Sequence, residues 1–370
     1  MNTLSWLVKE KRILFIVQHR FNRSPGQRYR CEQYLSYLES HGFECVYSPI
    51  ITTQAEDNAL YNSHNLLDKA MIFVRGFWRR LKDVRRASDF DIVFIYREAF
   101  MTGSVFFEKL FARSKSKIIL DFDDAIWLPT ISGANKSLAW LKRPEKINDI
   151  IGLSDLVITG NSYLADYARS YNPNVTVFPS TINLDYYRIP AKKTSDKVVI
   201  GWSGSHTTVE HFELIIPVFK TLKKKYGDTL KFAVYGDESY QNADLDIQGT
   251  RWSFDTEVAV ISSFDIGIMP LPNDDWSKGK CAMKGLQYMG LGVPAVLSSV
   301  GINKDVIQDG VNGFLANDEA AWISKLSLLI ESAALRVQLG TAGRNTIEQN
   351  FSSQALSPLY LRLFESVLKS

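Results

Sequence analysis

The stretch DIGIMPLPNDDWSKGKCAMKGLQYMGLGVP, residues 265–294, decides the fold more than any other part of the sequence. Its first residues, 266–269, form an apolar run typical of a buried strand, and a Pro-containing loop follows. A helix is predicted to begin near Gly279. Backbone N–H groups at such a helix N-terminus face whatever lies beyond the strand end, and they favour an anion. The stretch therefore predicts a strand, loop and helix with an anion site at the strand end.

Two lysines in the same stretch add positive charge to this predicted site. Lys280 and Lys284 are four residues apart, so they share one face of the predicted helix, and Gln287 continues near that face. The alternative is a solvated amphipathic helix with incidental lysines. We favour the anion site, because ligands of α/β proteins bind in crevices beyond the strand ends.

Working outward, short β-branched runs alternate with helical patterns along the whole chain, which is typical of parallel sheets with crossover helices. A polar stretch at 189–197 (IPAKKTSDK) separates two such series and is interpreted as a linker. Segment 357–370 has apolar residues at helical spacing. The predicted strands are 13–17, 43–48, 92–96, 117–121, 156–159 and 175–178 before the linker, and 198–202, 231–235, 266–269 and 295–297 after it.

Composition and length agree with two soluble α/β domains. The 370 residues are 45% hydrophobic and 22% charged, which excludes disordered and collagen-like chains. The formal charge of +3 is too small to suggest a nucleic-acid partner, although the first half is mildly basic and would suit anionic lipid or a phosphate-bearing substrate. Three cysteines without metal-ligand spacing favour a reducing, cytoplasmic location. No apolar run reaches the length of a membrane span, so membrane association would be peripheral.

The stretch at 265–294 resembles the donor-site signature of the family-4 glycosyltransferases. In that family a strand ends in Asp-x-x-x-x-Pro, a glycine-bearing loop follows, and a helix closes in Met-x-x-Gly-x-Pro. The sequences DGVNGFL at 309–315 and LRVQLGTAGRNTIEQNF at 335–351 resemble the segments that follow in the same family. The resemblance is specific over 198–370 and looser before it.

This resemblance implies the GT-B fold, with two Rossmann-like, doubly wound domains facing a cleft. The expected domains are an acceptor domain at 1–188 and a nucleotide-sugar donor domain at 198–356, with a terminal helix at 357–370 that crosses back to the first. The implied activity is transfer of a sugar from a nucleotide-diphosphate sugar to a glycan or lipid-linked acceptor, with retention, in surface polysaccharide or glycoconjugate synthesis. Neither a cofactor nor a metal ion is required. The alternatives are an epimerase or hydrolase of the same fold and a non-catalytic nucleotide-sugar binding protein.

The sequence departs from the family pattern at the donor site. The usual Glu-x7-Glu pair falls on Gly279 and Gln287, and the Gln287 amide could still hydrogen-bond a ribose hydroxyl. The usual diphosphate clamp is absent from GWSGSHTT at 201–208, so Lys280 and Lys284 are expected to replace it. The expected donor-binding residues are Gly204, Ser205, Gly236, Lys280, Lys284 and Gln287.

Glycine and serine at two strand ends complete this donor prediction. Gly204 and Ser205 would let the backbone approach the phosphates. The same segment is also compatible with a simple turn in which Ser205 or Thr208 caps a helix. Gly236, in FAVYGD at 232–237, resembles the glycine turn that borders the base in the family.

Three carboxylates follow a predicted strand in IILDFDDAIWLP at 118–129. One interpretation is a metal site of the DxD kind formed by Asp121 and Asp123. Another places Asp123 and Asp124 at the cleft as catalytic residues, and a third is a solvated turn in which an Asp caps a helix. We favour the catalytic interpretation because the second half points to a metal-independent donor site.

The acceptor is expected to meet two segments of the first domain. The loop QHRFNRSPGQRYR at 18–30 is too poor in glycine for a nicotinamide-binding motif, and its Arg28 and Arg30 are expected to bind a phosphate-bearing acceptor. Arg97 and Glu98 follow a strand and either line the cleft or form an ion pair within the domain. His19 and His206 are interpreted as structural.

The segment FVRGFWRRLKDVRR at 73–86 carries an apolar stripe beside six basic residues. The stripe consists of Phe73, Phe77, Leu81 and Val84. Such a helix could lie on an anionic membrane. An ordinary surface helix with its stripe toward the core explains the pattern equally well.

Overall fold

The computed structural model describes residues 11–61, 65–129, 143–190 and 196–369. They form two compact units. The first domain consists of the described residues up to Gly160, of Leu164–Phe178, and of the last helix from Ser357 onward; the second consists of Asn161–Tyr163 and Pro179–Leu356. Residues 191–195 of the predicted linker, and residues 1–10, lie outside the described residues. The exact boundary between the domains therefore stays a prediction.

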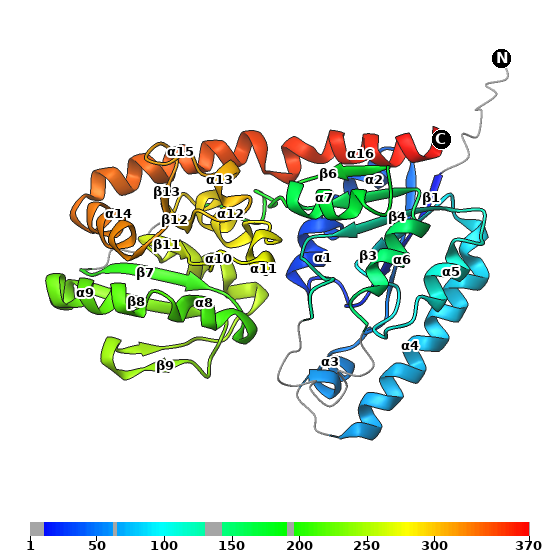
Figure 1. Cartoon of the computed structure of the whole chain (residues 1–370), viewed down its shortest axis with the longest axis horizontal. Coiled ribbons are helices and arrows are strands. Elements are labelled where there is room, and N and C mark those ends of the chain that lie inside the picture. Colours follow the sequence, from blue (N-terminus) through cyan, green and yellow to red (C-terminus); the bar gives the residue numbers. More distant parts are fainter. Residues whose placement is uncertain (1–10, 62–64, 130–142, 191–195, 370) are drawn as a thin grey trace, which may run out of the picture. The chain divides into compact units, whose positions relative to one another are not determined.

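A parallel six-stranded sheet forms the centre of the first domain (Figure 1). Its middle strands are runs of Ile, Leu, Val and Phe that are almost entirely buried, as expected where helices cover both faces of a parallel sheet. In spatial order the strands are β2 (Phe43–Pro49), β1 (Lys11–Val17), β3 (Ile92–Tyr96), β4 (Lys117–Phe122), β5 (Leu156–Thr159) and β6 (Val175–Val177).

Helices connect these strands, as crossovers between parallel strands require. They are α1 (Pro25–Arg30), α2 (Leu35–Ser40), α3 (Gln54–Tyr61), α4 (Leu66–Arg86), α5 (Phe106–Phe111), α6 (Lys146–Leu153) and α7 (Ser162–Arg169).

The C-terminal helix α16 (Ser353–Lys369) returns to the first domain. Tyr360 stacks on Tyr34 with ring centroids 4.1 Å apart, and its hydroxyl donates a hydrogen bond of 3.0 Å to the carbonyl of Arg30. Phe364 packs on Phe94 of β3, with centroids 5.9 Å apart. The apolar side of this helix therefore completes the core of the first domain.

The second domain is built on a parallel five-stranded sheet. In spatial order its strands are β13 (Phe314–Ala316), β12 (Ala295–Ser298), β11 (Ile266–Met269), β7 (Val198–Ser203) and β8 (Leu230–Tyr235), and β9 (Gln241–Asn242) pairs separately with β10 (Ile247–Gln248). The helices are α8 (Val209–Glu213), α9 (Ile216–Tyr226), α10 (Phe254–Ser262), α11 (Asp275–Lys278), α12 (Met283–Gly290), α13 (Asn303–Val306), α14 (Glu319–Glu331) and α15 (Ala333–Asn350).

The predicted fold class of two Rossmann-like α/β domains is confirmed. All ten predicted strands are present, with ends within two residues of the predicted ones. β13 and the short pair β9 and β10 were not predicted; strands of two or three residues leave at most a weak periodic signal.

The strand order gives each domain one switch point. In the first domain the chain moves from β1 to its neighbour β2 and then to β3 on the other side of β1. In the second domain it moves from β7 to β8 and then to β11 on the other side of β7. Crevices at such switch points, beyond the carboxyl ends of the strands, are the usual ligand sites of open α/β sheets.

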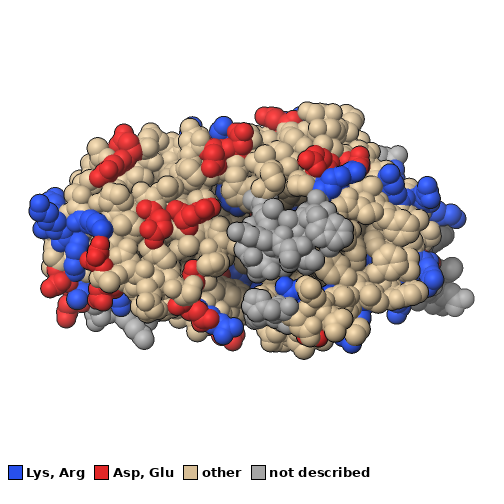
Figure 2. Space-filling model, turned by 60° about the horizontal axis from the view of Figure 1, so that its bottom comes forward, with Lys and Arg blue, Asp and Glu red and all other residues tan. Residues whose placement is uncertain are grey.

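Charge on the surface of α9 is largely neutralised locally. Three of its lysines form ion pairs with N–O distances of 2.6 to 3.0 Å: Lys220 with Asp244, Lys223 with Asp228, and Lys225 with Glu331. Figure 2 shows basic and acidic side chains gathered together at the left end of the view. This lysine-rich helix is therefore not the main candidate for an anion site.

Candidate functional site

The loops after β7 and β11 meet the switch point of the second domain. Gly204 and Ser205 follow β7 directly, and Pro270 opens the loop after β11. Lys280 and Lys284 lie further along the same segment, before and within α12. Four of the six predicted donor-binding residues thus belong to the segments that leave this switch point.

Gly204 and Gly236 bring the ends of β7 and β8 into contact. The N–H of Gly204 donates to the carbonyl of Tyr235 at 2.8 Å. Gly236 has a φ of +117°, and a Cβ added there would lie 1.8 Å from the carbonyl oxygen of Gly204. No residue with a side chain fits at this position without moving the backbone. The two glycines are therefore required by the fold, whatever ligand the loop meets.

Ser205 lies in an exposed turn that leads into α8. Its N–H donates to the Thr208 hydroxyl at 3.2 Å, and its own hydroxyl lies 2.8 Å from that of Thr207. The turn interpretation is thus present in the structure, and the exposed hydroxyl still permits a polar contact with a ligand.

His206 and Asp237 form a pair that sequence reasoning missed. Nδ1 of the exposed His206 ring lies 3.1 Å from Oδ2 of the buried Asp237, which also accepts from the Ser239 hydroxyl at 2.6 Å. Burial by itself would raise the pKa of Asp237, but the hydrogen bonds from Ser239 and His206 outweigh it and lower the pKa. The sequence did contain a signal for this pair, because Asp237, the last residue of FAVYGD, places an acid beside the glycine turn.

The helix predicted to begin near Gly279 begins instead at Met283. A short helix, α11, precedes it, because the Asp274 side chain accepts from the N–H of Ser277 at 2.7 Å and caps that turn. Ala282, with a φ of +56°, then interrupts the helical backbone. Lys280 therefore lies in a loop and does not share a helix face with Lys284, which corrects the predicted spacing argument.

Tryptophan rings nevertheless hold both lysines near this strand end. Nζ of Lys284 lies 5.6 Å from the ring centroid of Trp202, a buried residue of β7, and Nζ of Lys280 lies 4.3 Å from that of Trp276. An ammonium group over an aromatic face is attracted by the ring quadrupole. The two rings thus contribute to holding both ammonium groups near this strand end.

The pKa of His211 on α8 is lowered in part by the positive charge of these lysines. Burial contributes most to lowering its pKa, and the charges of Lys284 and Lys280 lower it further. Both ammonium groups are therefore within electrostatic reach of the helix that follows the β7 loop. Two ammonium groups therefore lie near the switch point of the second domain, where an anionic ligand could pair with them.

Gln287 does not have the exposed position that a ribose contact needs. It is buried, and its side-chain amide donates to the hydroxyl of Tyr187 at 2.8 Å and to Oε1 of Glu257 at 3.1 Å. Glu257 also accepts from Tyr187 and from the Trp252 indole. This buried network explains the residue, because a polar side chain inside a protein requires partners. The structure thus contradicts the predicted ribose contact.

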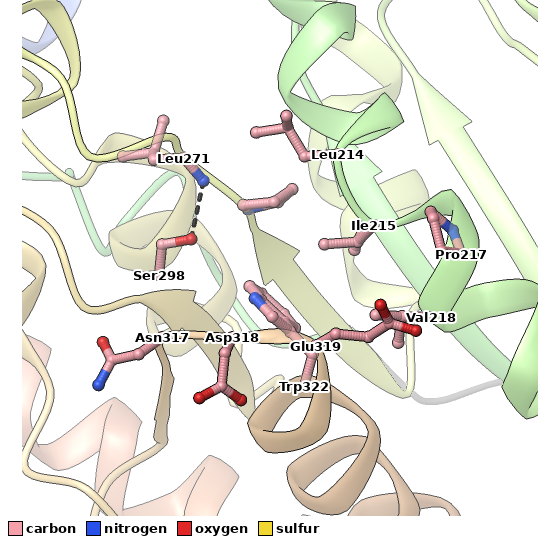
Figure 3. Close-up of a pocket in the computed structure, with 11 residues that line it drawn as sticks. Leu214, Ile215, Pro217, Val218, Leu271, Ser298, Asn317, Asp318, Glu319 and Trp322 are labelled. Carbon is pink, nitrogen blue, oxygen red and sulfur yellow. Dashed lines mark hydrogen bonds between the residues drawn. The ribbon is translucent and has the colours of Figure 1, made fainter.

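A pocket of about 180 Å³ lies at the carboxyl ends of β11, β12 and β13 (Figure 3). Apolar side chains from the start of α9 and Trp322 of α14 form much of its wall, and the Ser298 hydroxyl accepts from the N–H of Leu271 at 2.8 Å. Asp318 and Glu319 also line it, and none of its lining residues is a lysine or arginine. Its charge therefore does not suit a diphosphate.

In the first domain, a compact cluster follows β3 and β4. Arg97 donates to Asp123 at 2.7 Å and to Asp124 at 2.6 Å, and the Tyr96 hydroxyl donates to Asp123 at 2.8 Å. Arg97 has a φ of +63°, a conformation that is uncommon for a residue with a side chain. The structure thus brings Arg97, Asp123 and Asp124 together, as an ion-pair cluster.

The Arg97 guanidinium stays charged in this cluster. Partial burial alone would lower the pKa of Arg97, but the charges of Asp123 and Asp124 outweigh it and raise the pKa well above its usual value. The α1 backbone also approaches closely: a Cβ on Gly26 would lie 1.9 Å from the Tyr96 hydroxyl and 3.2 Å from Oδ2 of Asp123. Two carboxylates are thereby fixed beside one guanidinium at the end of the sheet.

Asp121 and Arg30 form a separate, fully buried pair. Nε and Nη2 of Arg30 donate to the two carboxylate oxygens of Asp121 at 2.8 and 2.7 Å, and neither side chain is exposed. Arg30 is therefore not available to an acceptor, which corrects its predicted role. Both oxygens of Asp121 are engaged, so the DxD interpretation of Asp121 and Asp123 does not fit either. Among the described residues, no group of three His, Cys, Asp or Glu is arranged to bind a metal ion.

Arg28 and Glu98 are held by neighbours. Arg28 is nearly buried, with its guanidinium 4.6 Å from the ring centroid of Tyr29. Glu98 accepts from Gln18 at 2.7 Å and pairs with Lys146 at 2.5 Å. Of the four predicted acceptor residues, Arg97 and Glu98 thus lie at the strand ends but in ion pairs, and the two arginines of α1 point into the domain.

Two other arginines of the same loop are more exposed. Arg20 and Arg23 each lie near Asp57, with N–O distances of 2.9 and 3.2 Å, and about a third of each side chain is exposed. They precede Pro25, where α1 begins, whereas Arg28 and Arg30 lie on that helix and turn inward. Because Pro is common at the first position of a helix, Pro25 predicts where α1 begins and so distinguishes the two loop arginines from the two helical ones.

Comparison with known proteins links the second domain to a family. Residues 197–332 match the family described as glycosyl transferases group 1. A capsular polysaccharide biosynthesis glycosyltransferase, CapM from Staphylococcus aureus, is 23% identical over 193 residues, which are 48% of this chain and 48% of that protein.

Solved structures share the fold over nearly the whole chain. Sucrose-phosphate synthase from Thermosynechococcus elongatus has a TM-score of 0.68 at 12% identity and covers 97% of this chain and 99% of its own. HepE from Anabaena, solved in complex with UDP-glucose, has a TM-score of 0.64 at 12% identity, over 96% and 99% of the two chains. The family match thus covers the second domain, and the likeness to these solved structures extends the shared fold over both domains.

Proposed function

We propose that the protein is a glycosyltransferase that uses a nucleotide-diphosphate sugar. The observation that carries this proposal is the position of Lys280 and Lys284 near α8 and the β7 loop, in the part of the chain that matches the group 1 family. HepE, which shares the fold, has been solved with UDP-glucose. In this proposal the diphosphate of the sugar nucleotide lies beside the two lysines and pairs with their ammonium groups.

In this reaction the bond between the anomeric carbon and the diphosphate breaks, and negative charge grows on the leaving phosphate. Ammonium groups placed at that oxygen stabilise the transition state more than the bound substrate. The exposed turn at Ser205 adds a hydroxyl to the same edge. We propose that Lys280 and Lys284 supply this stabilisation without a metal ion, and that the anomeric configuration is retained.

The first domain supplies the carboxylates in this proposal. Asp123 and Asp124 are held by Arg97 and Tyr96, and Asp124 remains partly exposed. We assign them to the reacting sugar and the acceptor hydroxyl, where an ionised carboxylate can accept a proton or a hydrogen bond. Arg97 then acts as a positioning residue for both.

The acceptor proposed is a phosphate-bearing glycan carrier. Arg20 and Arg23 both lie near the carboxylate of Asp57, and about a third of each side chain is exposed. Such a pair of guanidinium groups suits a phosphate. CapM acts in capsular polysaccharide biosynthesis, which supports a surface polysaccharide or glycoconjugate pathway. The proposed location is cytoplasmic, at the inner face of the membrane where lipid-linked acceptors are held.

Product analysis tests the proposal directly. The protein is incubated with UDP-, GDP-, CMP- and dTDP-sugars, with and without a membrane extract as acceptor, and products are identified by mass spectrometry. Transfer that needs the extract supports a glycosyltransferase; conversion of the sugar nucleotide alone supports an epimerase or hydrolase. Binding without any turnover favours the non-catalytic alternative, to which the loss of both Glu residues of the family pair, now Gly279 and Gln287, gives weight.

Chelation tests the metal-free mechanism. Turnover is expected to be the same in EDTA and in buffer, because lysines provide the charge that a metal ion would otherwise supply. Loss of turnover in EDTA that Mn²⁺ restores would contradict the assignment of Lys280 and Lys284.

A further inference from the structure

The long helix α4 buries several charged side chains and exposes several apolar ones. Arg80 is fully buried and donates to the carbonyls of Ser48 at 3.0 Å and Ala99 at 2.7 Å. Asp83, also buried, accepts from Arg80 at 2.9 Å. Lys69 is buried as well. Three charged side chains of a kind that normally faces water therefore point into the first domain.

The opposite face of α4 is apolar and exposed. Leu67, Met71, Val74 and Trp78 follow one another at spacings of four, three and four, so they lie along one stripe. Their exposed fractions are 77%, 52%, 54% and 59%. Monomeric soluble proteins rarely leave a contiguous apolar stripe of this length in water. The stripe is therefore a candidate docking surface, because contact with another surface would remove these apolar side chains from water.

This stripe differs from the one predicted from sequence. Phe73 packs against Phe100 with ring centroids 6.0 Å apart, and Phe77 against Phe107 at 5.1 Å. Leu81 and Val84 are half-buried. The predicted stripe is thus largely a packing seam of the first domain, and the exposed stripe lies beside it.

We propose that this face of α4 docks on an anionic lipid surface. Lys82 and Arg85 continue the apolar stripe at the same helical spacing, Arg75 lies beside it, and all three are exposed. Asp68 is the one exposed acid on α4. Figure 2 shows Lys and Arg side chains around a broad uncharged surface at the end that carries α4.

The chemistry of the face fits a membrane surface. A helix of 21 residues is about 31 Å long and can lie flat, with Trp78 at the headgroup level and the basic side chains toward lipid phosphates. No helix within the described residues is long and apolar enough to cross a membrane. A second copy of the chain is a poorer occupant, because two such faces would bring like charges together.

Vesicle flotation tests the proposal without relying on enzymatic activity. The full chain is expected to float with phosphatidylcholine vesicles that contain phosphatidylglycerol, less so at high salt, and not with phosphatidylcholine alone. Met71→Gln with Trp78→Gln should abolish flotation. Lys82→Glu with Arg85→Glu should weaken it about tenfold or more, since each basic residue near an anionic surface contributes about 1 kcal/mol.

Matched controls lie in the second domain. Leu214→Gln with Val337→Gln removes exposed apolar side chains, and Lys224→Glu with Lys304→Glu reverses exposed charges. Both controls should float like the wild type. Equal flotation with neutral and anionic vesicles, or equal loss in the controls and the α4 variants, would overturn the proposal. So would a dimer, measured by sedimentation, that the Met71 and Trp78 variant disrupts in the absence of vesicle binding.

Discussion

The charged side chains at the strand ends lie beside different groups in the two domains: guanidinium groups face carboxylates in the first, and ammonium groups lie over aromatic rings in the second. In the first domain each carboxylate faces a guanidinium, Asp121 with Arg30 and the pair Asp123 and Asp124 with Arg97. In the second domain Lys280 and Lys284 lie over tryptophan rings, and their charge still lowers the pKa of a neighbouring histidine. The ion pairs fix the geometry of the first cluster, and the two lysines bring positive charge to the strand end of the second, where it can attract a ligand of opposite sign.

The largest expected effect follows from breaking the buried pair of the first domain. Arg30→Met leaves the carboxylate of Asp121 uncompensated in the core and should lower the free energy of unfolding by about 3–5 kcal/mol. Urea denaturation measures this change. Adding Asp121→Asn to Arg30→Met should recover part of the loss, and a decrease below about 1 kcal/mol in the single variant would contradict the buried pair.

The next effect is on turnover, with little cost in stability. Asp123→Asn keeps the shape of the side chain and leaves Asp124 paired with Arg97, so the domain should remain folded. Turnover should fall about 10²-fold or more, as expected when a group that acts on a proton is removed. Steady-state kinetics and nucleotide titration test this together, with Asp155→Asn, a partly exposed partner of Lys117, as the control. An equal fall in nucleotide affinity would instead assign Asp123 to donor binding.

Replacing one lysine should weaken binding in the second domain. Lys284→Met keeps the aliphatic stem and removes the ammonium, so the Kd for the nucleoside diphosphate should rise about tenfold or more. Turnover should fall further, because charge on the leaving phosphate grows in the transition state. Calorimetric titration checks the affinity, and Lys278→Met, which removes a surface partner of Asp275, serves as the control. Unchanged affinity would place the diphosphate elsewhere.

The sequence predicted the strands and the fold class because both rest on periodicity. Apolar runs such as those of β1 and β11 predict buried strands whatever the order of the strands in the sheet, and turn residues mark their ends. The start of the helix predicted near Gly279 was harder to predict. The Asp274 cap and the left-handed Ala282 are local details that divide this segment into two helices, α11 and α12.

Side-chain direction explains most of the errors in the site. Spacing alone placed Arg30 and Gln287 at the right strand ends, but both point into the core and pair with residues distant in sequence, Asp121 and Glu257. The partner of a buried polar group is decided by tertiary packing, which no local pattern records. The predicted stripe on α4 left two interpretations open, since helix periodicity gives the faces but not which face is inside. The packing of Phe73 and Phe77 agrees with the core-facing interpretation.

The smallest expected effect is a change in the pKa of His211, and it reports on the lysine site without any reaction. Burial and the charges of Lys284 and Lys280 lower this pKa, so Lys284→Met should raise it. A nucleoside diphosphate bound to both lysines should raise it too, because an anion offsets their charge. NMR titration of the histidine rings measures both shifts, and Lys278→Met should leave the pKa unchanged. Since the folded state binds this proton less readily than the unfolded state, His211 costs stability as the pH falls below the ordinary histidine pKa of about 6.5, and Lys284→Met should reduce that loss. A His211 pKa that responds to neither the substitution nor the ligand would mean that the lysines and the diphosphate do not share the β7 end of the sheet.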